Sequence, residues 1–177
     1  MNLKEINPEV FFATDRIVTI TGKDIKYIEN QAQISPRRRA RICTHKTVED
    51  KLHEMTVFLK KNVYLIPEKH IIKIESYHII EGLADVVMFD EDGNVTDVIK
   101  IGDYSSGLPF YFRVSEPSFY HTMLIRTDYL IYHEVATGPF QKSDTIVASW
   151  APSEDDTEGI KIYMNDLEHR VKNHLNS

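Results

Sequence analysis

Glu68 and His70 are the residues of this chain most suited to chemistry, because they offer two metal ligands only two positions apart. On an extended strand, residues two apart point to the same face, so the carboxylate and the imidazole would leave the backbone together. Glu75 follows after a short turn, and His121 comes from a distant part of the chain. Carboxylate oxygens and imidazole nitrogens are common ligands of divalent transition metals. If the four side chains converge, they would hold one such metal inside a β-barrel.

The neighbours of these four residues also predict that the side chains face an interior. Strand alternation places mostly apolar or aromatic side chains on the same faces as the proposed ligands, and a carboxylate buried among such groups is costly unless a cation or a partner compensates it. The pattern favours a metal, while hydrogen bonds from tyrosines to the carboxylates are the alternative. The companions expected to point inward are Tyr64, Ile66, Tyr77, Ile79, Phe119, Met123 and Ile125.

Short runs of β-branched and aromatic residues, separated by turn residues, predict that the ligands lie on strands. Gly82 divides one long run into two strands, and the Asp90-Glu91-Asp92-Gly93 segment predicts a hairpin turn. Many short strands at close spacing indicate an all-β sandwich or small barrel. The expected strands cover residues 16–20, 55–59, 63–66, two segments within 73–89, 95–101, 110–114, 119–125 and 129–135.

Helical patterns flank the β-rich region. Thr21 and Asp24 form a capping-box pattern that opens a helix, and Ser35-Pro36 ends it. A second capping-box pattern at residues 47–50 predicts one helical turn. Near the end of the chain, residues at helical spacing share one apolar face. These are Ile160, Tyr163, Leu167 and Val171.

The patterns therefore divide the chain into three parts. Residues 1–46 are expected to form an N-terminal extension with a short strand, a helix and an Arg-rich segment. Residues 47–150 are expected to form the barrel, and residues 151–177 the C-terminal helix.

Composition narrows the classes of partner. The formal net charge of −6 argues against a general nucleic-acid binder, which needs a basic face for phosphates. Cys43 is the single cysteine, so no intrachain disulfide can form. The chain shows no apolar signal region and no apolar run of membrane-spanning length, so we expect a cytoplasmic protein without a membrane partner.

Several segments resemble the cupin motifs. Glu75, six intervening residues and Gly82 fit the first motif, and the Glu116-Pro117-Ser118-Phe119-Tyr120-His121 segment is similar to a diverged second motif. Further segments, over roughly residues 35–154, resemble the WbuC family of cupin-fold metalloproteins. These are Ser35-Pro36-Arg37-Arg38-Arg39 followed by His45, the Phe89 to Gly93 hairpin, Gly138-Pro139-Phe140 and Trp150-Ala151-Pro152.

The resemblance implies an antiparallel jelly-roll barrel with one divalent transition metal (Mn, Fe, Zn or Ni) bound by Glu68, His70, Glu75 and His121. Glu68 stands where the family has a histidine. An oxygen ligand there would shift the preference toward harder ions such as Mn²⁺ or Fe²⁺. Alternatively, Glu68 swings away and leaves a site of three ligands.

Other residues admit two interpretations each. Arg37, Arg38 and Arg39 are either a salt-bridged surface run or a clamp for an anionic ligand, since guanidinium binds phosphate and carboxylate bidentately. His45 either folds over the barrel mouth toward the ligand or is a loop histidine without a role. Tyr77 is expected to pack in the barrel, with contact to a ligand as a secondary role.

The resemblance also implies a role in bacterial surface-polysaccharide (O-antigen) biosynthesis. One hypothesis is a metal-dependent isomerase or epimerase of a sugar or sugar nucleotide, in which the arginines hold phosphate and a tyrosine or His45 moves protons. The alternative is a non-catalytic binding or regulatory module for a small anionic or sugar-like ligand. The sequence leaves open whether the protein is an enzyme and whether its terminal additions support a homodimer.

Overall fold

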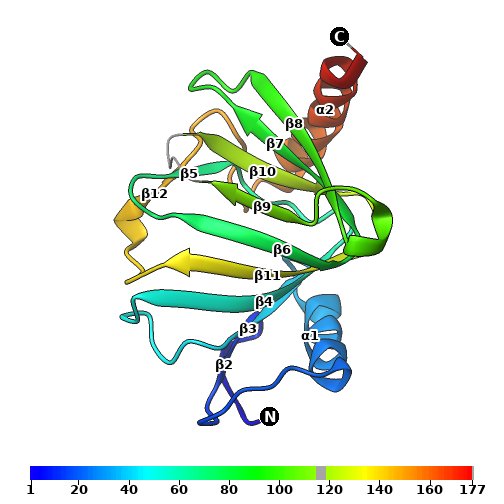
Figure 1. Ribbon diagram of the computed structural model, residues 1–177. Coiled ribbons are helices and arrows are strands. Elements are labelled where there is room, and N and C mark those ends of the chain that lie inside the picture. Colours follow the sequence, from blue (N-terminus) through cyan, green and yellow to red (C-terminus); the bar gives the residue numbers. More distant parts are fainter. Residues whose placement is uncertain (115–118, 177) are drawn as a thin grey trace.

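The computed structural model describes residues 1–114 and 119–176, which form two β-sheets packed face to face with one helix on the outside of each (Figure 1). The larger sheet has the strand order β1 (Leu3–Asn7), β2 (Val10–Ala13), β3 (Arg39–Cys43), β4 (Leu52–Lys60), β11 (Tyr129–Thr137), β6 (Glu75–Glu81) and β9 (Tyr111–Val114). The smaller sheet has the order β12 (Thr145–Val147), β5 (Glu68–His70), β10 (Tyr120–Ile125), β7 (Leu83–Phe89) and β8 (Val95–Gly102).

Neighbouring strands pair antiparallel, except β2 and β3, which run parallel. The helices are α1 (Gly22–Ile34) and α2 (Thr157–Asn176), with short 3₁₀ turns η1 (Tyr104–Ser106) and η2 (Lys142–Asp144). The all-β jelly-roll prediction is therefore confirmed. Among the described residues, no helix has the length and hydropathy of a membrane span.

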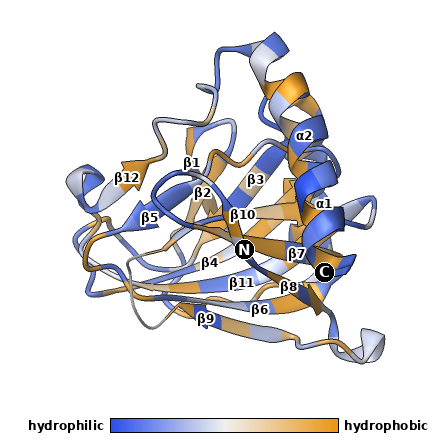
Figure 2. Ribbon diagram, turned by 90° about the horizontal axis from the view of Figure 1, so that it is seen from above, coloured by the Kyte–Doolittle hydropathy of each residue, from blue (hydrophilic) through white to orange (hydrophobic). Residues whose placement is uncertain are grey.

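Three apolar layers hold this arrangement together. The inward faces of both sheets enclose the main core, which includes Val57, Leu130 and Val86. Outside the larger sheet, Ile28 and Ala32 of α1 pack on Phe11, Ile42 and Phe58. Outside the smaller sheet, Leu167 and Val171 of α2 pack on Val87, Phe89 and Leu124. Figure 2 shows hydrophilic and hydrophobic segments side by side on both helices, as expected for helices that cover a sheet with one face.

Local signals placed several boundaries correctly. The Thr21 backbone N–H donates to Asp24 Oδ2 over 2.8 Å, so the predicted capping box is present, and α1 ends before Pro36. Gly82 separates β6 from β7 with a φ of +98°, and an added Cβ would lie 2.5 Å from the carbonyl oxygen of Tyr129. Only glycine combines this left-handed backbone with such a close approach.

Two predicted strands are wrong. Residues 16–20 do not form a strand, and residues 63–66 lie outside the strands as well, because β5 begins only at Glu68. In both cases the short β-branched pattern lacked a neighbouring strand to complete the element. Residues 47–50 form a single hydrogen-bonded turn, in which Asp50 N donates to Thr47 O and Thr47 Oγ1 donates to Asp50 Oδ1, and no longer helix follows it.

Four strands were not predicted. β1, β2 and β3 extend the larger sheet at one edge, and β12 borders the smaller sheet beside β5. All four are short, and β1 and β3 carry charged residues such as Arg39 and Arg41. Their pairing with neighbouring strands, rather than a long alternating pattern of their own, makes them strands.

Candidate metal centre

Three of the four predicted ligands meet inside the barrel. His70 ends β5, Glu75 begins β6 and His121 lies in β10. Glu75 Oε1 is 3.3 Å from His70 Nε2 and 2.9 Å from His121 Nε2. One ligand atom from each residue lies within 4.8 Å of the others, and all three residues are buried. The group therefore has the composition and the spacing of a small metal site.

The strand pairing explains why residues from separate elements converge. His121 lies in the same sheet as His70, because β10 pairs with β5. Within this pair of strands, His121 is opposite Glu68. The turn after His70 then carries the chain to the other sheet, where Glu75 begins β6. Two hydrogen bonds hold this turn in place: Ile71 N donates to the backbone oxygen of Asp144, and Ile74 N donates to the Thr137 side chain at Oγ1. Glu75 thus faces the two imidazoles across the barrel.

Each imidazole is oriented through its other ring nitrogen. His70 Nδ1 lies 3.2 Å from Thr145 Oγ1 on β12, and His121 Nδ1 lies 3.3 Å from the carbonyl oxygen of Phe119. Both Nε2 atoms are consequently the ones directed at Glu75. Such outer contacts fix ring orientation in metal sites. Sequence analysis missed Thr145 because β12 was not predicted.

Lys73 is a further part of the centre that sequence analysis missed. Its ammonium lies 2.6 Å from Glu75 Oε2 and 3.9 Å from Glu134 Oε1. Lys73 therefore holds one oxygen of Glu75, while the other oxygen faces the imidazoles. Alternation along β11, in which Leu130, Tyr132, Glu134 and Ala136 share a face, was the available signal for Glu134.

Two buried atoms at the centre lack hydrogen-bond partners among the described residues. They are His70 Nε2 and Glu75 Oε1, which face each other. Buried polar atoms without partners are costly and uncommon in folded proteins. A cation between the rings and the carboxylate would satisfy both atoms, so the residues present fit a metal.

The electrostatics of the centre also favour a positive charge. Burial by itself would raise the pKa of Glu75, but the adjacent His121 and His70 imidazoles and the Lys73 ammonium hold this pKa far below its usual range. Burial would lower the pKa of His121, yet the Glu75 carboxylate raises it above the ordinary imidazole value. Burial raises the pKa of Glu134, against the opposing influence of Lys73.

Glu68 lies at the margin of the centre. Its Oε1 is 3.9 Å from His70 Nε2, and its side chain is 37% exposed. It does not belong to the group of three ligand atoms that lie within 4.8 Å of one another. This is the arrangement expected if Glu68 swings away from a three-ligand site.

The companion residues divide into two sets. Tyr77, Ile79, Met123 and Ile125 lie in the main core, as predicted. The prediction was wrong for Tyr64, Ile66 and Phe119. Tyr64 donates to the Pro152 carbonyl oxygen and packs near Tyr163 of α2, Ile66 lies outside the strands and the core clusters, and Phe119 is exposed. Strand parity does not carry through residues 63–67, because this segment is not a strand.

The arginine segment lies in ion pairs rather than beside the metal ligands. Arg37 contacts Glu9 and Glu154 at 3.0 and 2.8 Å, and Arg39 contacts the same two carboxylates at 3.5 and 3.1 Å. Arg38 is exposed and has a φ of 56°. The two paired guanidinium groups therefore link the N-terminal segment to the residues before α2.

His45 lies outside the group of three ligands. It is buried and stacks on His53, with ring centroids 4.1 Å apart and ring planes 2° from parallel. Burial is the main cause that lowers the pKa of His45, and the neighbouring His53 lowers it further. Residues Glu116, Pro117 and Ser118 of the second motif lie outside the described residues.

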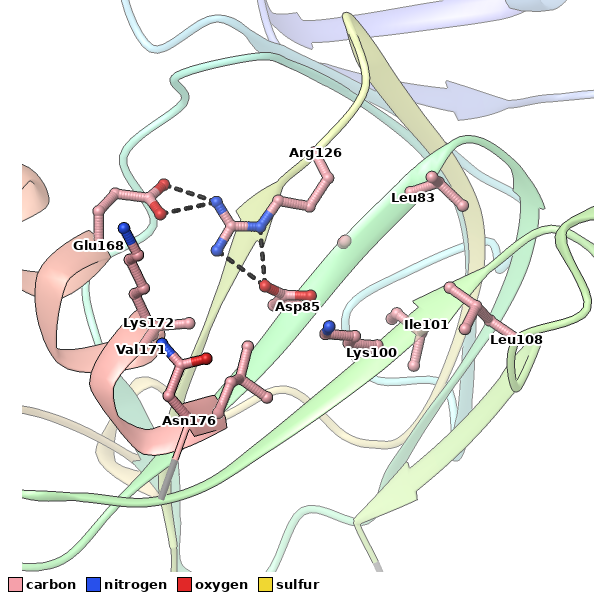
Figure 3. Close-up of a pocket in the computed structure, with 12 residues that line it drawn as sticks. Leu83, Asp85, Lys100, Ile101, Leu108, Arg126, Glu168, Val171, Lys172 and Asn176 are labelled. Carbon is pink, nitrogen blue, oxygen red and sulfur yellow. Dashed lines mark hydrogen bonds and ion pairs between the residues drawn. The ribbon is translucent and has the colours of Figure 1, made fainter.

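A larger cavity of about 500 Å³ lies away from the metal ligands, between α2 and strands β7 and β8 (Figure 3). Arg126 spans it, with Nε and Nη2 on Asp85 at 2.8 and 2.7 Å and Nη1 on Glu168 of α2 at 2.7 Å. These pairs satisfy the guanidinium within the protein. We therefore interpret the triad as a structural link between α2 and the smaller sheet.

Comparison with known proteins supports the fold. Residues 20–101 match the model of a family described as a domain of unknown function (DUF6016). No curated protein matches the sequence.

Among solved structures, the capsular polysaccharide assembling protein CapF from Staphylococcus aureus is similar at a TM-score of 0.51 and 14% identity, over 64% of this chain and 30% of CapF. Protein SO0799 from Shewanella oneidensis matches at a TM-score of 0.47 and 12% identity, over 59% of this chain and 66% of that protein. Oxalate decarboxylase from Bacillus subtilis matches at a TM-score of 0.45 and 18% identity, over 62% and 27% of the two chains. The likeness to CapF and the two-sheet topology show that this chain has a jelly-roll cupin fold.

Proposed function

We propose that this protein binds one divalent transition metal through His70, Glu75 and His121, and that the metal centre binds a small anionic or sugar-related ligand. The observation that carries the proposal is the facing pair of buried atoms, His70 Nε2 and Glu75 Oε1, which lie 3.3 Å apart without hydrogen-bond partners among the described residues. Two imidazoles and one carboxylate suit Mn, Fe, Zn or Ni. Glu68 is near enough to join as a fourth ligand after a side-chain rotation.

The chain's own residues have defined tasks in this proposal. Lys73 holds Glu75 Oε2, so the carboxylate presents a single oxygen toward the imidazoles. Thr145 and the Phe119 carbonyl orient the two rings. When bound, the metal would supply Lewis-acid polarisation of a ligand oxygen. Glu134, with its raised pKa and its position beside Lys73, would hold or release a proton next to the bound ligand.

This arrangement supports a metal-dependent enzyme that moves a proton, such as an isomerase or epimerase. The ion pairs of Arg37 and Arg39 with Glu9 and Glu154 favour a ligand smaller than a sugar nucleotide, because these guanidinium groups are already engaged. They equally favour the alternative of a non-catalytic binding module. A role in surface-polysaccharide (O-antigen) metabolism rests on the residues that resemble the WbuC pattern, since the likeness to CapF concerns the fold alone.

Elemental analysis of the purified full chain tests the proposal. We expect about one transition-metal ion per chain in the wild type, and a loss of most of this metal in His121→Ala and His70→Ala. His78→Ala is the matched control, because His78 is exposed on β6. Equal metal content in the wild type and His121→Ala would contradict the proposal. So would a wild-type protein that stays metal-free after incubation with Mn²⁺, Fe²⁺, Zn²⁺ and Ni²⁺.

A further inference from the structure

A cavity of about 280 Å³, here called the entrance pocket, lies beside the metal centre. Its lining includes Lys73, which contacts Glu75, and Thr145, which contacts His70. The start of β6, the end of β11 and strand β12 lie at the same end of the barrel (Figure 1). The volume is just below the usual range of about 300–1,000 Å³ for small-molecule sites, so it suits only a small ligand. The entrance pocket therefore offers a small ligand a place next to the metal ligands.

Apolar side chains form the outer wall of the entrance pocket. Ile72, on the turn between β5 and β6, is 66% exposed, and Phe140, on the segment after β11, is 54% exposed. Pro139 also lines the pocket. Phe140 N donates to Val48 O, so its loop is tied to a third loop at this end. Large apolar side chains gathered beside a polar centre are typical of a ligand site.

The charges in the lining are few and of opposite sign. The Lys73 ammonium lies on the side of the metal centre, through its contact with Glu75. The Asp144 carboxylate also lines the pocket, and its side chain has no ion-pair or hydrogen-bond partner in the part of the chain that the structure describes. Glu75 already neutralises the Lys73 ammonium, so the divalent metal of the proposed function would supply the net positive charge that attracts a ligand with one negative group. A second negative group near Asp144 would be repelled.

We propose that the entrance pocket binds a monocarboxylate with a short apolar tail. The carboxylate would lie toward Lys73 and the metal ligands, and the tail would lie against Ile72 and Phe140. Asp144 would disfavour dicarboxylates of the same length. This inference rests on the proposed function, since it names the class of ligand that the metal centre receives.

Isothermal titration of the metal-loaded full chain with acetate, hexanoate and hexanedioate tests the inference. If each of the four added methylenes is about half buried, hexanoate should bind roughly tenfold more tightly than acetate or better. Hexanedioate should bind more weakly than hexanoate. Ile72→Ser and Phe140→Ser should remove most of the preference for hexanoate over acetate, and Asp144→Asn should improve binding of hexanedioate. Ile162→Ser is the matched control, because Ile162 is an exposed isoleucine on α2.

The metal content of each sample distinguishes a failure of this inference from a failure of the proposed function. A chain that holds its metal but binds all three acids equally would overturn this inference and leave the proposed function standing. A chain without metal would overturn both. If Ile72→Ser instead changes the mass measured by light scattering and the acids show no preference, the apolar wall is a contact with a second copy and the inference is wrong.

Discussion

Replacement of Glu75 by glutamine is the sharpest test of the centre, because it keeps the side-chain shape and removes the charge. The Glu75 side chain is 1% exposed and lies between the Lys73 ammonium on one oxygen and the two imidazoles on the other. A glutamine has one oxygen and one amide group, so it cannot serve both sides as an acceptor. The variant would leave a buried charge or a buried nitrogen without a partner.

The expected cost follows from the contacts. Removing one partner of a buried ion pair costs about 3–5 kcal/mol. The Lys73 side chain is 20% exposed and keeps Glu134 at 3.9 Å, so we expect a value near the lower end, about 3 kcal/mol in the metal-free protein. For a chain of this size, each kcal/mol lowers Tm by about 2–4 °C, which predicts a decrease of roughly 6–12 °C. A metal at a hundredfold excess over its Kd stabilises the wild type by about 2.7 kcal/mol, and the variant should lose this increment.

Thermal unfolding followed by circular dichroism, in chelator and in added metal, measures both effects. Glu158→Gln is the control, since Glu158 is an exposed residue of α2 and its replacement should change stability by less than about 0.5 kcal/mol. The double variant Lys73→Met/Glu75→Gln should recover part of the loss, because it removes the stranded ammonium as well. The reasoning fails if Glu75→Gln melts within about 2 °C of the wild type in chelator and still gains stability from metal.

Two other predictions concern the ion-pair triad and the buried histidine. Arg126→Met should destabilise the fold by about 2–3 kcal/mol in urea unfolding, because it strands Asp85, while the 30% exposure of the Arg126 side chain screens part of the cost. Adding Asp85→Asn should recover much of this loss, and a purely additive loss would exclude a direct pair. His45 has a pKa below the usual 6.5, so the unfolded chain binds more protons and stability should fall as the pH drops below about 6.5. Urea midpoints at pH 7.5 and 5.5 should differ less in His45→Gln than in the wild type; equal pH dependence would exclude His45 as a cause.

Local patterns predicted much of the barrel. The period-two alternation around Met55, the break at Gly82 and the hairpin before Val95 each correspond to the observed strand or turn. The capping box at Thr21 and the apolar stripe of α2 also match the structure. These signals depend on neighbours within a few residues, so the chain carries them without reference to the fold.

The site was predictable only where a regular strand continued through it. Parity from Glu75 placed Tyr77 and Ile79 in the core, and parity from His121 placed Met123 there. The same rule misplaced Tyr64, because the segment before β5 is not extended in a strand, and parity has no meaning across an irregular segment.

The sequence by itself determined which side chains could act as ligands and which strands could carry them. Only the tertiary structure decided that Lys73 holds Glu75, that Glu134 lies beside Lys73, and that Glu9 and Glu154 pair with Arg37 and Arg39, which is one of the two interpretations open to the arginine segment. Lys73 and Glu75 are only two positions apart, but the other contacts join distant segments of the chain, and their distances depend on strand register and on the course of the connecting turns. Periodicity depends on residues that are close in the sequence, whereas an ion pair between distant residues forms only when the whole barrel has folded.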